Sequence, residues 1–405
     1  MRTLAFFSVF HPRRMGIADY SDDLVAALSR HLDITCYVEE GYEPDRVCEF
    51  ARVQPHTTFR GREDVALFQI GNSTELAFQL EHLIRHGGVA TLHDACQLDL
   101  TYPYFRAHRW RFAVEVFRSV DPAARRRLLP RTLNPARWLH HAFATYEQHP
   151  DKRRLFPFSR FVLRHADRLV VHSDYLRDYA RQLTPRLPVN VVRLGVRPVV
   201  LGSRAASRRR LAEQLGVAVG PATLVFLSFG ALQAHKRIAA VLRAFQAFRA
   251  EHADAVYVLV GPRDSTYDLE AEIRAHGAAD RVKIIDTYLP MEMVNELIQA
   301  ADLTFNLRWP SLGSTSSTLH KIFAVGRPSV ITRADSFRDY PEELVFAVPP
   351  PPGDGEWRGC LEAMRTAADD PDRLAAMGER ARAYVAEHCS WERVAESYRK
   401  ILAAT

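Results

Sequence analysis

Short runs of apolar residues alternate along the chain with longer segments in which apolar positions recur every three or four residues. In the first half of the chain, the apolar runs that predict strands are 3–9, 33–38, 65–70, 89–92, 168–172 and 189–193. The segments with helical periodicity are 18–31, 75–86 and 175–183, together with a helical insert at about 99–165. Continuous apolar strands that alternate with helices are typical of a parallel sheet covered on both faces.

A second strand–helix series begins after residues 197–222, which are rich in Arg, Ala, Ser and Gly and contain a short helical piece. Its predicted strands are 223–229, 255–260, 282–285, 302–307 and 328–332. Its predicted helices are 238–252, 269–276, 291–300, 316–325 and roughly the last 25 residues.

The two series predict an α/β protein with two Rossmann-like parallel-sheet domains of similar size. The expected boundaries are 1–196 for the first domain, 197–222 for a linker, 223–385 for the second domain and 386–405 for a C-terminal helix. Ligands of such sheets bind at the carboxyl ends of the strands, so we expect the substrate in a central cleft that both domains face.

The composition is that of an ordinary globular protein, with 405 residues of which 47% are hydrophobic and 25% are charged. It excludes a mostly disordered chain, a collagen-like fibre and a miniprotein held together by disulfides. The five cysteines are scattered and form no Cys-x-x-Cys pair, which indicates a reduced, cytoplasmic protein without a zinc ribbon. The first apolar run, residues 4–10, is far shorter than the about 20 residues that span a bilayer, so we interpret it as a buried strand.

Arginine dominates the charge of this chain, which has a formal net charge of +6. Only five of its 54 basic residues are lysines, and nine arginines lie between residues 106 and 137. Aromatic side chains lie in or beside this block, over residues 102–138. Such a segment can bind an anionic membrane surface, here the inner face of a membrane, or it can be a solvated helical face. Since no zinc-finger spacing or other nucleic-acid module is present, a nucleic-acid partner is not expected.

Two candidate sites follow strands of the first series. Gly16 lies just before a helix start, where backbone N–H groups and the helix dipole favour an anion, although an ordinary loop with Asp19 or Ser21 as the N-cap is the alternative. His93 and Asp94 directly follow a buried strand, so we expect them to project into the cleft. The imidazole could hydrogen-bond a sugar hydroxyl or a phosphate, with Asp94 holding its tautomer. The alternative for this pair is a polar strand end that caps the next segment.

Two further candidates follow strands of the second series. Lys236 and Arg237 lie at a predicted helix start shortly after a strand that ends in Gly230. Two fixed cations there suit a diphosphate, which carries about two negative charges, whereas a solvated basic pair is the alternative. The run 314–318 places several hydroxyls at another helix start, as an anion site or as an ordinary N-cap. Together with Gly16, these residues predict one phosphate site shared by the two domains.

Several other kinds of chemistry lack their motifs in this chain. It has no Gly-x-Ser-x-Gly elbow, no His-Glu-x-x-His pair, no carboxylate-rich calcium loop and no Gly-x4-Gly-Lys-[Ser/Thr] loop. Hydrolysis by a serine triad, by a bound metal or by a P-loop is therefore not expected.

The order and spacing of the motifs resemble those of the retaining glycosyltransferases of family 4, which have the two-Rossmann GT-B fold. Over nearly the whole chain, the segments that carry this resemblance include GIADYSDDLVAAL at 16–28, TLHDA at 91–95, FLSFGALQAHKR at 226–237, LHKIFAVGRPSVIT at 319–332 and CSWERVAESYRKIL at 389–402. The resemblance implies an enzyme of glycan biosynthesis that moves a sugar from a nucleotide-diphosphate donor to an acceptor hydroxyl with retention of configuration. It also implies that the last helix crosses back to the first domain.

The same resemblance implies roles for single residues. Gly16 would lie against the donor diphosphate, His93 would contact the sugar, and segment 287–292 would hold the base. As catalytic residues it implies His93, Lys236 and Arg237, of which the last two would neutralise the diphosphate. The residues that it implies in donor binding are Gly16, Ile17, Gly230, Leu289, Gly313, Ser314, Thr315, Ser316, Ser317 and Lys321. Neither a metal nor another cofactor is implied, because fixed cations and helix termini stabilise the leaving group instead.

The chain departs from this family in the loop before 316. The family usually has a Glu there, in the pattern Gly-Glu-x-Ser or as one of two glutamates; the corresponding residues here are Ser314, Gly313 and Lys321. No carboxylate occurs between Arg308 and Gly326. Those glutamates hydrogen-bond ribose and sugar hydroxyls, so a catalytically silent homologue, which binds a sugar nucleotide or scaffolds a partner enzyme, is the alternative function. The base, the sugar and the acceptor (a glycan, a lipid-linked molecule or a small molecule) stay open.

Overall fold

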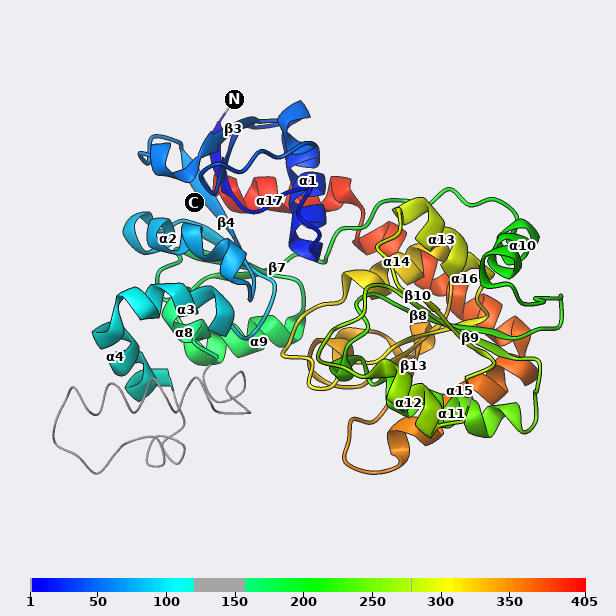
Figure 1. Cartoon of the computed structure of the whole chain (residues 1–405). Helices are drawn as coiled ribbons and strands as arrows, with labels where there is room; N and C mark the ends of the chain where they lie inside the picture. The colour runs from blue at the N-terminus through cyan, green and yellow to red at the C-terminus, as the bar shows by residue number, and fades with distance from the viewer. Residues whose placement is uncertain (1, 120–156, 278) are drawn as a thin grey trace, which may run out of the picture. The chain divides into compact units, whose positions relative to one another are not determined.

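The computed structural model describes residues 2–119, 157–277 and 279–405 (Figure 1). The chain divides into two compact units. The first unit comprises Met1–Gly195, Leu312–Thr315 and Trp391–Thr405, and the second comprises Val196–Ser311 and Ser316–Ser390. Each unit contains its own parallel sheet, so that each is an α/β domain.

The described residues of the first unit form a seven-stranded sheet with the order β3-β2-β1-β4-β5-β6-β7. Its strands are β1 (Thr3–Phe7), β2 (Asp33–Val38), β3 (Arg52–Pro55), β4 (Val65–Ile70), β5 (Val89–Leu92), β6 (Arg168–Val171) and β7 (Val189–Val191). All pairs are parallel, and β1 lies between β2 and β4, with Phe7 opposite both Tyr37 and Phe68. The strand order therefore reverses at β1, and the crevice between the carboxyl ends of β1 and β4 is the usual place for a ligand.

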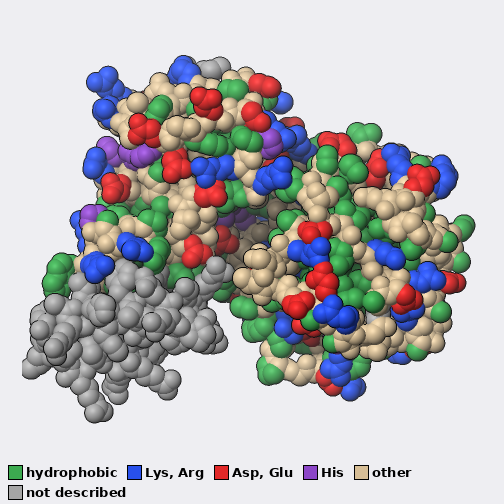
Figure 2. All heavy atoms as spheres, viewed as in Figure 1, with side chains coloured by type: hydrophobic (Ala, Val, Ile, Leu, Met, Phe, Trp, Pro, Cys, Tyr) green, Lys and Arg blue, Asp and Glu red, His purple; other side chains and the backbone are tan. Residues whose placement is uncertain are grey.

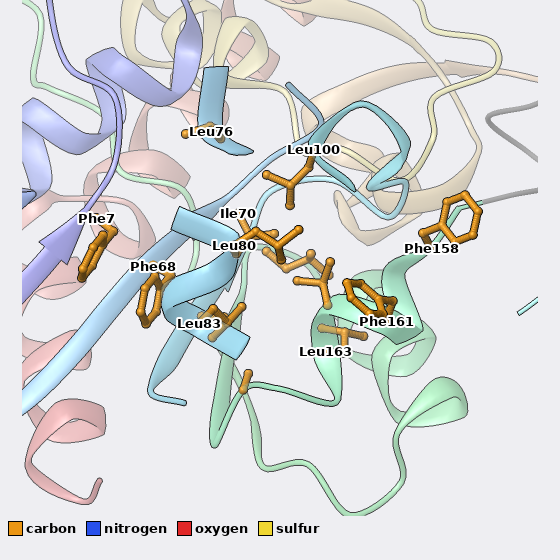
Figure 3. Packing of buried hydrophobic residues seen from close by; sticks show 14 of the residues in the cluster. Phe7, Phe68, Ile70, Leu76, Leu80, Leu83, Leu100, Phe158, Phe161 and Leu163 are labelled. Atoms are coloured by element: carbon orange, nitrogen blue, oxygen red, sulfur yellow. The ribbon is translucent and has the colours of Figure 1, made fainter. Parts of the chain in front are cut away.

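Helices cover both faces of this sheet because successive strand residues point to opposite sides. The helices of the first unit are α1 (Gly16–Leu28), α2 (Leu80–His86), α3 (Leu98–Ala107), α4 (Arg109–Ser119), α8 (Ser159–Leu163), α9 (Asp174–Leu183) and α17 (Trp391–Ala403). Phe7 belongs to a buried cluster that also contains Phe68 of β4, Leu83 of α2 and Phe161 of α8 (Figure 3). Its neighbour Phe6 faces the other side, where it packs with Leu24 of α1 and Tyr398 of α17.

The described residues of the second unit form a six-stranded parallel sheet with the order β10-β9-β8-β11-β12-β13. Its strands are β8 (Val225–Phe229), β9 (Val256–Val260), β10 (Val282–Ile285), β11 (Leu303–Asn306), β12 (Ser329–Thr332) and β13 (Val345–Val348). Its helices are α10 (Arg204–Leu215), α11 (Ile238–Arg249), α12 (Leu269–Ala275), α13 (Met291–Ala300), α14 (Ser317–Val325), α15 (Gly355–Asp369) and α16 (Pro371–His388). Here the strand order reverses at β8, so β8 and β11 flank the crevice.

Short 3-10 helices complete the two units. They are η1 (Val47–Glu49), η2 (His56–Thr58), η3 (Thr74–Gln79), η4 (Ala234–Lys236), η5 (Asp335–Asp339) and η6 (Glu342–Leu344). The structure confirms the two parallel-sheet α/β domains predicted from the sequence. It adds β3, β13, α15 and the first part of α16, which the apolar pattern did not predict. The predicted helix over roughly the last 25 residues corresponds to the end of α16 and to α17.

The arginine-rich segment lies only partly in the described structure, where α3 and α4 carry its beginning and the rest falls within 120–156, outside the described residues. Figure 2 shows Lys and Arg side chains interspersed with Asp and Glu over the visible face of both units. None of the described helices is long and apolar enough to cross a membrane.

Candidate functional site

The carboxyl ends of β8 and β11 bring together the predicted site residues of the second unit. Gly230 directly follows β8 and has a φ of +111°, a backbone conformation that favours glycine. A Cβ atom at this position would lie 3.6 Å from Nζ of Lys236 and 3.6 Å from Oγ1 of Thr318. The ammonium group and the hydroxyl therefore converge on the space that the missing side chain leaves open.

Lys236 is the cation of this site. It lies at the end of η4 and, with Gly230 and Asn306, lines a small pocket between the ends of β8 and β11. Burial lowers the pKa of Lys236 well below its usual value, and the nearby charge of Arg308 lowers it further. A bound anion would favour the charged ammonium, so the site is suited to an anionic ligand.

The N-terminus of α14 forms the other side of the site. Ser316 is its N-cap, and the fully buried hydroxyl oxygen accepts a hydrogen bond from N of Leu319 at 3.2 Å. The same oxygen accepts from Nδ2 of Asn306 at 2.9 Å and from Nη2 of Arg308 at 3.2 Å. The cap thus ties the helix start to the end of β11, where the N–H groups of the first turn and the helix dipole favour negative charge.

Arg237 is held differently from its neighbour Lys236. It has a left-handed φ of 58° at the N-cap of α11, and its Nε and Nη2 atoms donate to the carboxylate of Glu356 at 3.0 and 2.7 Å. Glu356 lies on α15 and is 3% exposed. The hydrogen bonds that Arg237 donates to this carboxylate raise the pKa of Arg237. The structure therefore balances the charge of Arg237 inside the second unit, which the sequence did not indicate.

The remaining predicted donor-binding residues lie in three places. Ser317 opens α14, Lys321 lies one turn further along the same helix, and both are partly buried. Leu289 precedes α13 and packs against the core on that side of the sheet. Gly313, with a φ of +78°, groups with the first unit together with Ser314 and Thr315.

In the first unit, Gly16 and Ile17 open α1 after the carboxyl end of β1. A Cβ atom at Gly71, which follows β4, would lie only 2.1 Å from Cδ1 of Ile17. The helix start therefore packs closely against the end of β4, at the crevice of this sheet. Met15 is the N-cap, and its side chain has no oxygen that could accept from the first-turn N–H groups. The alternative that Asp19 or Ser21 caps this helix is wrong, because both lie inside it.

His93 is buried in a chain of hydrogen bonds at the ends of three neighbouring strands. Its Nε2 atom lies 2.9 Å from Oε1 of Gln69, and its Nδ1 atom lies 3.2 Å from Nε2 of His172. His172 in turn donates from Nδ1 to the carbonyl oxygen of Val192 at 2.9 Å. Oδ2 of Asp94 accepts a hydrogen bond from the backbone N–H of Asn72. The two ring nitrogens of His93 contact Gln69 and His172, so these hydrogen bonds do not join His93 to Asp94.

Burial keeps both imidazoles neutral. It lowers the pKa of His93 well below its usual value, with a smaller contribution from His172, and lowers the pKa of His172 to about 4. Both ring nitrogens of His93 are engaged within the first unit. His172 and Gln69 were missed from the sequence, although one signal was present: His172 directly follows β6, as His93 follows β5.

Comparison with known proteins identifies the class of this fold. Residues 213–384, which are less than half of the chain, match the family described as glycosyl transferases, group 1. Apart from Leu312–Thr315, this matching segment lies within the second unit. No curated protein matches the chain.

Several solved structures are similar to this protein over nearly the whole length of its chain. The sucrose-phosphate synthase of Thermosynechococcus elongatus has a TM-score of 0.65 and 16% identity, with 100% of both chains covered. HepE of Anabaena in complex with UDP-glucose has a TM-score of 0.63 and 14% identity, again with 100% of both chains covered. WaaG, a glycosyltransferase involved in lipopolysaccharide biosynthesis, has a TM-score of 0.62 and 14% identity over 99% of this chain and 100% of its own. At these identities the likeness shows the fold, which is GT-B.

Proposed function

We propose that this chain is a glycosyltransferase that moves a sugar from a nucleotide-diphosphate donor to an acceptor hydroxyl with retention of configuration. The observation that carries the proposal is the convergence of Lys236 Nζ and Thr318 Oγ1 on Gly230. This convergence lies at the crevice of the second sheet, inside the segment that matches group 1 glycosyl transferases.

The chemical role of the site follows from the charge that develops during transfer. As the bond between the sugar C1 and the diphosphate oxygen breaks, negative charge grows on the departing diphosphate. The ammonium of Lys236 and the first turn of α14 offset that charge. The acceptor oxygen attacks from the same face, and its proton passes to the departing phosphate oxygen. In this scheme no side chain acts as a general base, and the buried His93, with both ring nitrogens engaged, fits that expectation.

Two parts of the proposal concern ligands. We propose that transfer needs no metal ion or other cofactor, so that a chelator leaves the rate unchanged. HepE was solved with UDP-glucose, which makes that donor the first to test. For the acceptor, a glycan, a lipid-linked molecule or a small molecule would fit a cytoplasmic enzyme. The basic, aromatic segment 102–138 would bring such an enzyme to the inner face of a membrane.

The second candidate function is a catalytically silent homologue that binds a sugar nucleotide or scaffolds a partner enzyme. It is favoured by the absence of a carboxylate from Arg308 to Gly326. In this segment the family 4 glycosyltransferases, which the chain resembles, use glutamate to bind donor hydroxyls. The arrangement of Gly230, Lys236 and Thr318 serves binding in both candidates, so only turnover separates them.

A panel of nucleotide sugars tests the proposal, with release of the nucleoside diphosphate and the mass of the product as readouts. Donor hydrolysis counts as turnover when no acceptor is known. We expect Lys236→Ala to lose about 10²–10³-fold in rate while it stays folded, because it removes charge stabilisation from the departing group. Lys400→Ala is the matched control, since this lysine lies on α17 with its side chain 72% exposed.

The panel has two unfavourable outcomes. Donor binding without release from any nucleotide sugar would favour the silent homologue. Near wild-type turnover in Lys236→Ala would contradict the role given to this site.

A further inference from the structure

The second unit holds a cation that the sequence did not single out. A diphosphate carries more negative charge than Lys236 alone can offset. The neighbouring Arg237 is paired with the buried carboxylate of Glu356, so its charge is already balanced. Another basic residue near this site is Arg308, which follows β11 and contacts Ser316 at the N-cap of α14.

Three contacts fix Arg308 at this place. It follows the end of β11, and its backbone N–H donates to Oγ1 of Thr332, the last residue of β12, at 3.1 Å. Its Nη2 atom donates to Oγ of Ser316 at 3.2 Å, so the guanidinium lies at the N-terminus of α14. Cζ of the guanidinium lies over the ring of Phe337, 6.0 Å from its centroid. The side chain is therefore preorganised beside the first turn of α14.

Two independent observations connect this position to a ligand. Nη2 of Arg308 and Nδ2 of Asn306 both donate to Oγ of Ser316, and Asn306 lines one pocket with Lys236. In keeping with this placement, the charge of Arg308 lowers the pKa of Lys236. A bound anion would offset this effect. In addition, Oδ1 of Asn306 has no hydrogen-bond partner within the described residues, although Asn306 is 3% exposed and lines the pocket with Lys236. A sugar phosphate supplies both an anion and hydroxyl groups that could donate to this oxygen.

We propose that Arg308 is the second cation of the donor diphosphate site, beside Lys236, and that Arg237 is a positioning residue that fixes the Lys236 turn through Glu356. This inference rests on the proposed function, because it names residues of the same donor site. The two arginines then have separate roles, since Arg308 contacts the diphosphate and Arg237 acts through the α11–α15 contact.

The geometry of Arg237 explains why it suits the positioning role. Arg237 directly follows Lys236 in the chain and has a left-handed φ of 58°, which is a strained conformation. The ion pair with Glu356 holds Arg237 in this conformation and so fixes the turn that carries Lys236. A lysine at 237 keeps the charge but cannot form the same forked pair of hydrogen bonds. Arg237→Lys therefore keeps the positive charge and loses the forked hydrogen bonds to Glu356. A loss of binding in this variant would indicate a positioning role for Arg237.

Calorimetric titration of the purified full chain with UDP, GDP and ADP, and with their uncharged nucleosides, tests the proposal. We expect Arg308→Met to weaken binding of the preferred diphosphate by about 10–100-fold, the usual range for a hydrogen bond to a charged group. Affinity for the matching nucleoside should change less than about threefold, because only the phosphate contact is lost. Arg308→Lys, which keeps a charge, is the second variant and should bind with intermediate affinity. Arg333→Met is the matched control, since Arg333 directly follows β12 and pairs with the exposed Glu342.

The same titration tests the positioning role. We expect Arg237→Lys and Glu356→Gln to weaken diphosphate binding by similar factors, and the double variant to be no weaker than either, because both break one ion pair. The effect of Arg308→Met should add to theirs. If Glu356→Gln instead tightens binding, Arg237 contacts the phosphate and the proposal is overturned.

The remaining outcomes separate the inference from the proposed function. Wild-type affinity for the diphosphate in Arg308→Met overturns the inference alone. A wild-type chain that binds none of the three diphosphates overturns both the inference and the proposed donor site.

Discussion

The imidazoles of His93 and His172 take part in three hydrogen bonds, to Gln69, to each other and to the carbonyl oxygen of Val192. Two neutral rings carry only two N–H groups, so they can donate only two of these three bonds. His172 uses its N–H towards the carbonyl oxygen of Val192, so it accepts from His93 at its other nitrogen. His93 must then accept at Nε2, and Gln69 satisfies this requirement when its amide NH2 group faces that atom. The pair is thus a neutral, internally satisfied unit in the first sheet.

This arrangement predicts how activity depends on pH. Because burial lowers the pKa of both histidines, neither ring gains a proton between pH 8 and 6.5. We expect His93→Ala to lose turnover substantially through disorder of the strand ends, while the wild-type rate shows no steep loss as the pH falls through that window. A steady-state rate profile checks this. A sharp sigmoid that His93→Ala abolishes would show base chemistry at His93 instead.

The loop before Ser316, which has no carboxylate, offers a second test of donor binding by substitution of single residues. We expect Ser314→Glu to preserve or improve use of a neutral-sugar donor, because a carboxylate forms stronger hydrogen bonds to sugar hydroxyls than neutral groups do. Donor affinity of the wild type should accordingly be modest. Ser317→Glu is the control, since a carboxylate in the first turn of α14 would compete with the diphosphate and should weaken binding. Loss of all donor binding in a folded Ser314→Glu protein would mean that the loop recognises a different ligand.

At the scale of elements, the turn between β1 and α1 is fixed by a buried carboxyl group. Oδ2 of Asp22, on α1, accepts from the backbone N–H of His11 at 3.1 Å. Its Oδ1 atom is buried and has no hydrogen-bond partner among the described residues. Burial raises the pKa of Asp22 to about 6, from an ordinary value of 3.8. Ionisation of this group therefore opposes folding near neutral pH.

The raised pKa predicts a pH-dependent stability with a definite sign. The favourable contribution of protonated Asp22 is fully present below pH 3.8 and is lost as the pH rises through about 6. A shift of about two units corresponds to at most about 3 kcal/mol. We expect Asp22→Asn to gain free energy of unfolding relative to the wild type between pH 4.5 and 7, measured by chemical denaturation at each pH. Asp23→Asn, the next position of α1, serves as the control and should show a much smaller gain, because the charge of Asp23 raises the pKa of Asp22 less than burial does.

Prediction from the sequence worked best for elements buried on both faces. Interior strands such as β8 and β9 are continuous apolar runs, so their pattern is unambiguous. The missed strands β3 and β13 are both edge strands, where one side lacks a neighbour and polar residues are tolerated. The sequence Arg-Val-Gln-Pro of β3 has no apolar run to detect.

At the scale of the whole molecule, each unit places a candidate glycine beside the point where the strand order of its own sheet reverses. Gly16 in the first unit and Gly230 with Lys236 in the second were predictable, because each follows an apolar strand in the sequence. The partners that decide how these groups act were not predictable. Glu356 is 119 positions from Arg237, and only the fold brings their side chains together.

The central claim is that the crevice between β8 and β11 binds the diphosphate of a nucleotide sugar through Lys236. The most direct measurement is the ratio of affinities for a nucleoside diphosphate and its nucleoside, by calorimetric titration of the wild type, Lys236→Ala and Lys400→Ala. We predict a large preference for the diphosphate in the wild type and in Lys400→Ala, and loss of most of that preference in Lys236→Ala. An unchanged preference in Lys236→Ala, or none in the wild type, would contradict the account.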